Sequence, residues 1–129
     1  MTFMIIKTPL DVIRHTGSYR DSTKGNRTVD REPEYIEDVK FSIQPFTKGS
    51  TQHVLPEGIK SDDARVLFTK FAMKQASQKT KLKADRVEID DEIYVAFKVA
   101  NWSTHGLLAD HYEALAIRED ILSQFNLED

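Results

Sequence analysis

The chain contains no cysteine among its 129 residues. This absence excludes a disulfide scaffold, a thiol nucleophile and a cysteine-ligated zinc site, and it fits a reducing cytosol. No apolar run approaches the roughly 20 residues of a membrane-spanning helix, so we expect no contact with a membrane. The opening segment MTFMIIKTPL also lacks the basic region, the long apolar stretch and the cleavage site of a secretion signal.

Motifs of catalysis are equally scarce. The sequence has no nucleophile elbow of the G-x-S-x-G type and no phosphate-binding loop. His105 and His111 flank Asp110, but their spacing matches no helical pair of metal ligands. The acids from Asp90 to Glu92 lack the spacing and the glycine of a calcium loop, and they fit a solvated turn. We therefore predict that the protein is not an enzyme and binds neither a metal nor a cofactor.

The composition is that of one folded domain, spanning residues 1–129. Hydrophobic residues make up 40% and charged residues 30% of the sequence. The net charge of −3 conceals an uneven distribution, because residues 70–83 contain five lysines and no acid, which leaves −8 for the rest of the chain. A mostly acidic body with one cationic segment is not typical of a protein that binds nucleic acid over a broad face.

The lysine-rich segment, residues 70–83, allows two interpretations. Its charges either balance the acidic remainder from a solvated loop, or they contact phosphates or an acidic partner surface. Single-stranded nucleic acid favours aromatic residues between the lysines, and the segment contains only Phe71. The candidate contact residues for DNA or for a partner protein are Lys74, Lys79, Lys81 and Lys83.

Alternation of apolar and polar residues is the dominant structural signal. Along residues 34–46 one parity is mostly apolar, with Tyr35, Val39, Phe41 and Ile43. Alternate side chains of a strand point to the same face, so this pattern predicts a strand that is buried on one side. Pro45 lacks a backbone donor and is expected to end the strand or to make a bulge.

Residues 86–102 predict a β-hairpin. Two runs with apolar residues at odd positions flank Asp90 and Asp91, and aspartate tolerates the positive φ of a tight turn better than most residues. With the strand at 34–46, the shared parity predicts one buried cluster. Its predicted members are Phe41, Ile43, Val87, Ile89, Val95 and Phe97. Trp102 follows the hairpin and is expected to plug the core or its edge.

Three further strands are expected. Residues 111–119 form one, residues 64–72 form one that is covered on both faces, and residues 10–19 form a weaker first strand. Residues 120–129 predict a tail or a short helix with Asp120 as its N-cap, and a second helical turn is expected near residues 50–55. The fold class is therefore mainly β, a small β-barrel or sandwich with long loops and one or two short helices.

The long connections are the other feature of this fold. They span residues 17–33, 47–63 and 73–85. Connections of this length are usually functional or become ordered on a partner. The first two are so polar that we expect them not to be buried within their own domain.

A series of short motifs follows a defined order along residues 34–119, the expected core. They are Gln44-Pro45, Leu55-Pro56-Glu57-Gly58, Leu67-Phe68-Thr69, the hairpin at 85–95, Trp102, and His111-Tyr112 with Ala114. In their order and spacing they resemble the small head-to-tail joining proteins of tailed bacteriophages. Asp91 departs from that pattern, since such hairpins commonly carry glycine there, and this departure leaves the type of turn open.

The resemblance implies a small β-barrel or sandwich, assembled as a ring of identical subunits in the neck of the virion. Members of this family serve as connector, head-closure or tail-joining components between a portal or adaptor protein and the tail proteins, and the double-stranded genome passes through the ring. It therefore implies a virion protein that is assembled in the host cytoplasm, with the head-closure layer favoured. A tail-completion protein, and a free β-barrel that binds nucleic acid or peptide, are the alternatives.

Overall fold

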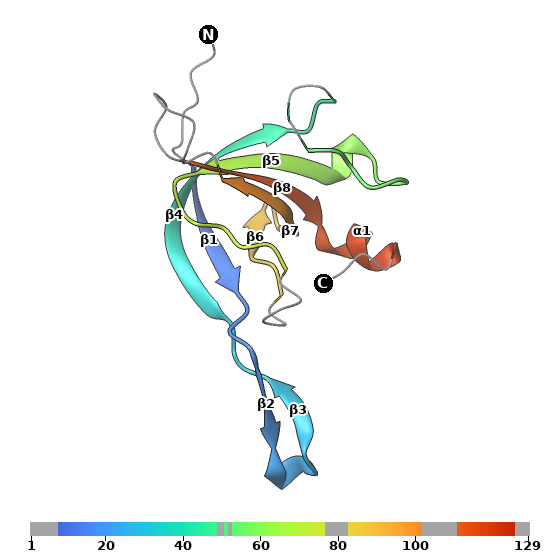
Figure 1. Cartoon of the computed structure of the whole chain (residues 1–129). Helices are drawn as coiled ribbons and strands as arrows, with labels where there is room; N and C mark the ends of the chain where they lie inside the picture. The colour runs from blue at the N-terminus through green and yellow to red at the C-terminus, as the bar shows by residue number, and fades with distance from the viewer. Residues whose placement is uncertain (1–7, 49–50, 52, 77–82, 102–110, 126–129) are drawn as a thin grey trace.

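The computed structural model describes residues 8–48, 51, 53–76, 83–101 and 111–125, and its architecture is mainly β. Six antiparallel strands form a closed barrel in the order β1-β4-β5-β8-β7-β6, and β6 pairs again with β1 (Figure 1). These strands are β1 (Thr8–Arg14), β4 (Glu34–Pro45), β5 (Ala64–Thr69), β6 (Arg86–Ile89), β7 (Glu92–Asn101) and β8 (Tyr112–Arg118). The predicted β-barrel is confirmed, although it begins with β1, ahead of the expected core.

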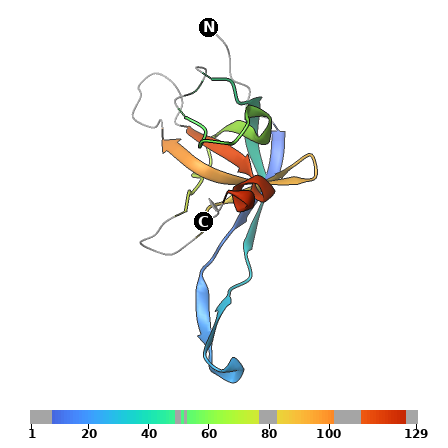
Figure 2. The same ribbon diagram turned by 90° about the vertical axis from the view of Figure 1, so that its right-hand side faces the viewer.

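The first long connection forms a hairpin. Strands β2 (Ser18–Asp21) and β3 (Arg27–Asp30) make a separate two-stranded sheet, joined through a 3-10 turn, η1 (Ser22–Lys24). We call residues 17–31 the arm, and it extends away from the barrel in both views (Figures 1 and 2). At its base the backbone N–H of Arg31 donates to the carbonyl oxygen of Gly17 at 2.9 Å.

A bulge in β4 changes which side chains face the barrel interior. The register between β1 and β4 shifts by one residue between Leu10 and Val12, and Asp38 of β4 has a φ of 58° there. On the N-terminal side of this bulge, even-numbered residues of β4 face the interior in place of odd-numbered ones. Ile36 therefore packs against the core, whereas Tyr35, predicted to be buried, is 63% exposed.

The hairpin between β6 and β7 turns through Asp90 and Asp91, as predicted. Both residues have positive φ, 51° and 65°, which corresponds to a type I′ turn. A two-residue turn pairs odd-numbered with even-numbered residues, so Val87 lies opposite Tyr94. The prediction that odd-numbered residues of both strands share one face is therefore wrong, and on β7 the interior side chains begin with Tyr94 and Ala96.

The buried apolar side chains that the structure describes form two clusters in place of the single one predicted. The interior cluster draws on all six barrel strands and contains Phe41, Val87 and Ile89, with Ile43 packed against it. Val95 belongs to the second cluster, and Phe97 packs at its edge. The second cluster lies on the opposite face of β5, β7 and β8, beneath Ile59 and beneath Leu122 of helix α1 (Glu119–Gln124).

Several smaller predictions also have outcomes. The strand β4 ends at Pro45, and β5 is covered on both faces, as predicted. The short helix α1 is confirmed, but its N-cap is Arg118 and not Asp120. A 3-10 turn, η2 (Ser61–Asp63), lies later than the turn expected near residues 50–55, a segment that is only partly described. Trp102 lies outside the described residues.

No helix in the described part of the chain is long and apolar enough to cross a membrane.

Candidate functional site

The candidate lysines belong to the connection between β5 and β6. Lys74 and Lys83 are exposed near its two ends, whereas Lys79 and Lys81 lie outside the described residues. The backbone N–H of Lys74 donates to the carboxylate of Asp85 at 2.8 Å, and its carbonyl oxygen accepts from the N–H of Asp85 at 2.8 Å. These two bonds fix the first described part of the connection to the residue that precedes β6.

Asp85 is fully buried and forms an ion pair with Arg14 at the end of β1. The guanidinium donates from Nε to Oδ1 at 2.9 Å and from Nη2 to Oδ2 at 2.7 Å. It also donates to the carbonyl oxygen of Ala72 at 2.9 Å and lies 4.9 Å from the ring centroid of Phe71. The hydrogen bond to Asp85 raises the pKa of Arg14 against the opposing effect of burial. We call Arg14, Asp85 and their partners the Asp85 cluster.

A second buried carboxylate, Glu113 of β8, holds the connection between β4 and β5. Thr51 donates its hydroxyl to Glu113 Oε2 at 2.8 Å, and His53 Nε2 lies 3.2 Å from the same oxygen. The side chains of His53 and Glu113 are only 8% and 7% exposed. The prediction that this polar connection is not buried within its own domain is therefore wrong at His53, because Glu113 supplies it with a polar partner, whereas most of the other described residues of the connection are exposed or half-buried.

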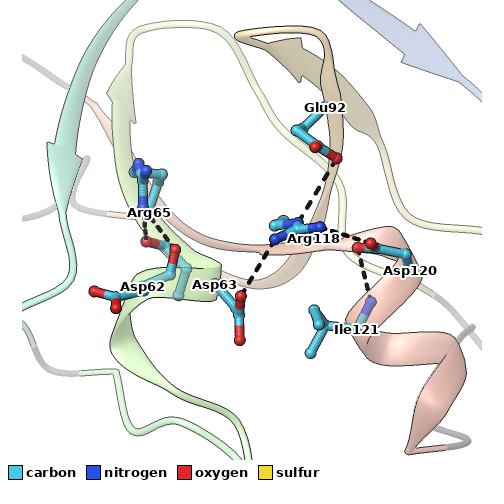
Figure 3. Close-up of polar contacts among 8 residues, drawn as sticks. Asp62, Asp63, Arg65, Glu92, Arg118, Asp120 and Ile121 are labelled. Carbon is cyan, nitrogen blue, oxygen red and sulfur yellow. Dashed lines mark hydrogen bonds and ion pairs between the residues drawn. The ribbon is translucent and has the colours of Figure 1, made fainter.

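Arg118, at the end of β8, contacts carboxylates from three elements (Figure 3). It donates from Nη2 to Asp120 of α1 at 2.7 Å and from Nη1 to Asp63 of η2 at 3.5 Å. Its Nε lies 3.7 Å from a carboxylate oxygen of Glu92 at the start of β7. The hydrogen bond to Asp120 is the largest cause that raises the pKa of Arg118. This network positions α1 and η2 at one end of the barrel.

An open groove of about 950 Å³ lies along β1 and β4 and reaches the turn between β6 and β7. Its acidic lining residues are Asp11, Glu37, Asp38, Glu88, Asp90 and Asp91. Tyr35 lies among them, and no lysine or arginine is present among the described residues that line the groove. One nearby cation, Lys40, pairs with Asp38 at 2.8 Å. We call this surface the acidic groove.

The sequence pointed to some residues of these polar contacts and not to others. Asp85 and the acids of the hairpin belong to the motifs, but nothing in the sequence pointed to Arg14, Glu113 or Arg118 as their partners. Those contacts join residues far apart in the chain, and Arg14 and Asp85 are separated by 71 positions. A single polar residue at the end of a predicted strand carries no signal of such a partner.

The distance between His105 and His111, the histidine pair considered as a metal site, is not defined, because His105 lies outside the described residues. The ring of His111 lies 6.1 Å from that of Phe68, between centroids, in a tilted arrangement. Within the described ranges no group of three or more histidine, aspartate or glutamate side chains is arranged to hold a metal ion.

Comparison of the chain with protein-family models, with curated proteins and with solved structures found no match in any of the three. Function is therefore inferred from the motifs and the geometry of this chain.

Proposed function

We propose that this protein is a structural ring component of the neck of a tailed bacteriophage, where it joins the DNA-filled head to the tail in the head-closure layer. The observation that carries the proposal is that the motif residues behind the resemblance hold long connections onto a closed barrel. Such a rigid body with extended connections suits a subunit that contacts copies of itself on both sides and other proteins above and below.

Thr69 illustrates the role of these motif residues. Its side chain is buried, and its hydroxyl donates to the carbonyl oxygen of Lys40 on β4 at 2.8 Å. The hydroxyl oxygen of Thr69 in turn accepts from the backbone N–H of Phe71 at 3.1 Å. Thr69 therefore sets the direction in which the lysine-rich segment leaves β5. Asp85, which follows the segment, binds Arg14 of β1 and the backbone of Lys74 near the start of the segment, and so joins its two ends.

The elbow at residues 55–58 has an equally specific role. Ile59 donates its backbone N–H to the carbonyl oxygen of Pro56 at 3.2 Å, and Gly58 has a φ of 91°. A Cβ at Gly58 would lie 2.8 Å from the ring of Phe125. Only glycine combines that conformation with that close approach. The elbow thus packs the second long connection against the residue that follows α1.

The charge of the molecule is compatible with a DNA channel. The net charge is −3, and the chain outside the lysine-rich segment is strongly acidic. Carboxylates repel phosphates within about a Debye length, roughly 8 Å at physiological salt. A ring with such a wall lets duplex DNA pass without the tight, salt-dependent binding that many cationic contacts produce. In this proposal the partners are identical subunits, a portal or adaptor protein, tail proteins and the genomic DNA.

Electron microscopy of the phage particle, with the density of this chain located, tests the proposal. We expect a ring of copies in the neck, directly below the portal or its adaptor. A ring on the tail side of the joint would instead identify a tail-completion protein. Particles without this chain would rule out a structural role in the neck.

A further inference from the structure

The arm is the element least explained by the fold of a single chain. Its two strands pair only with one another and share no ladder with the barrel. Among the side chains of the arm that the structure describes, Val29 is half-buried and the others are exposed. An isolated two-stranded hairpin is marginally stable in water at best, because it has no apolar face to bury. An ordered arm therefore calls for support from a second molecule.

The charge of the arm indicates the kind of surface that supports it. Its basic residues are Arg20, Lys24, Arg27 and Arg31, and its acidic residues are Asp21 and Asp30, so the arm carries a net charge of +2. Three of the four basic residues fall within residues 20–27 of the sequence, a range that includes the turn of the arm. The side chain of Arg27 is exposed. A complementary surface is acidic and open enough to admit two strands.

The barrel of the same chain carries such a surface. The acidic groove has six carboxylates and an exposed tyrosine, Tyr35, and its volume is about 950 Å³. Tyrosine suits a docking surface, since it contributes a large contact area and a hydroxyl at a low cost in conformational entropy. The arm does not fill the groove of its own chain, because it points away from its own barrel (Figures 1 and 2).

We propose that the arm of one copy lies in the acidic groove of the next copy. From Gly17 to the tip at Gly25 the arm spans at most about 30 Å, which is comparable to the diameter of a barrel of this size. Arm and groove are different surfaces, so the contact is head-to-tail and propagates around a ring. The inference rests on the proposed function for closure of the ring, whereas the contact itself requires only two copies.

Disulfide cross-linking tests this contact cleanly, since the chain has no cysteine of its own. Two purified variants, Ser22→Cys at the arm tip and Glu37→Cys in the groove, are mixed at about 1 mM, where a contact with a millimolar Kd is well populated. Under oxidised glutathione we expect a heterodimer to predominate. A mixture of Ser22→Cys with Ser123→Cys, an exposed position on α1, is the matched control and is expected to cross-link at least about tenfold less.

Charge reversal tests the chemistry of the contact. We expect Arg27→Glu, introduced into the Ser22→Cys chain, to reduce the cross-link about tenfold, because it places a carboxylate against the acidic groove. Glu88→Arg in the Glu37→Cys chain is expected to restore it. Lys60→Glu makes the same charge change away from the arm and is expected to leave the cross-link unchanged. The cross-link should also weaken between about 50 mM and about 500 mM salt, as screening increases.

Three outcomes would overturn the inference. Equal cross-linking to Ser22→Cys at positions 37 and 123 would show random collisions. A cross-link that Arg27→Glu leaves intact would show that attraction between the arm and the carboxylates of the acidic groove does not produce the contact. Retention of duplex DNA by the wild-type chain, lost in Arg27→Glu, with no heterodimer in the mixture, would assign the arm to DNA. A confirmed heterodimer from a chain that is absent from the phage neck would leave this contact standing and refute the proposed function alone.

Discussion

At the scale of single residues, Asp85 connects three separate parts of the chain. Its carboxylate binds Arg14 of β1 and the backbone of Lys74, and its own carbonyl oxygen accepts from the N–H of Ala96 on β7 at 2.9 Å. An ion pair of this kind is expensive to break from one side only, because the remaining charge is left without a partner.

We predict that Asp85→Asn destabilises the fold by about 3 kcal/mol, near the lower end of the range for a broken buried ion pair. The lower end applies because the side chain of Arg14 is 19% exposed and retains some water. Chemical denaturation of the two proteins measures the difference. In a double-mutant cycle, Arg14→Met combined with Asp85→Asn should lose much less than the sum of the single variants. Additive losses would contradict the pairing.

The lysines make a prediction about the proposed joint. We expect the triple variant Lys79→Ser, Lys81→Ser and Lys83→Ser to impair the joining of heads to tails while DNA retention in joined particles stays normal. Lysines that faced the channel would make many phosphate contacts around a ring and hinder ejection, which favours contact with an acidic protein surface. Each such surface pair contributes only about 0–1 kcal/mol, so the role is one of orientation.

Counting of joined particles by microscopy and measurement of packaged DNA check this prediction. A second triple variant, with Lys48, Lys60 and Lys98 changed to serine, removes the same charge from exposed positions elsewhere and should join normally. Normal joining with DNA that leaks or stalls in the first variant would place its lysines against DNA.

At the scale of elements, two irregularities determine which side chains face the core. The bulge at Asp38 turns Tyr35 outward into the acidic groove and Ile36 inward. On β7 the register shifts between Ala96 and Lys98, which leaves Phe97 as the additional residue. Each insertion of one residue moves every later side chain of the strand to the other face. The parity of a strand therefore predicts its faces only up to the first bulge.

Two phenylalanines test this arrangement against each other. Phe41→Ala should destabilise the protein by about 3–5 kcal/mol, because its side chain is fully buried inside the barrel. Phe97→Ala should lose only about 1–2 kcal/mol, because Phe97 is partly exposed at the edge of the second cluster. Thermal melts of the two variants give the order directly. Equal losses would contradict the placement of Phe97 at the partly exposed edge of the second cluster.

At the scale of the whole molecule, the polar surface bears on assembly. The arm and the acidic groove are charged, and the apolar residues of the barrel are mostly within its two clusters. Contacts between exposed charges are weak and decrease with salt. Association must also overcome the loss of translational and rotational freedom, at least about 4 kcal/mol. Contacts of this kind alone do not hold a closed ring together.

We therefore predict that the isolated chain is a monomer or a weak oligomer and closes into a ring only on a partner ring. Sedimentation of the purified chain over a range of concentrations measures this directly. Addition of the assembled portal or adaptor ring should shift the chain into the heavier complex. A stable, closed dodecamer without any partner would contradict the dependence on a partner ring.

The sequence by itself determined the approximate positions of the barrel strands, the tight turn at Asp90 and Asp91, and the mainly β class, because alternation and turn residues act between near neighbours. It also indicated the end of β4 at Pro45, where the missing N–H is a property of the residue itself. Only the tertiary structure decided that residues 17–31 form an arm, that the apolar residues divide into two clusters, and that Asp85 meets Arg14. Bulges reverse the faces of strands, and barrel closure brings distant residues together. Both depend on the sum of many weak, non-local contacts, which no short segment encodes.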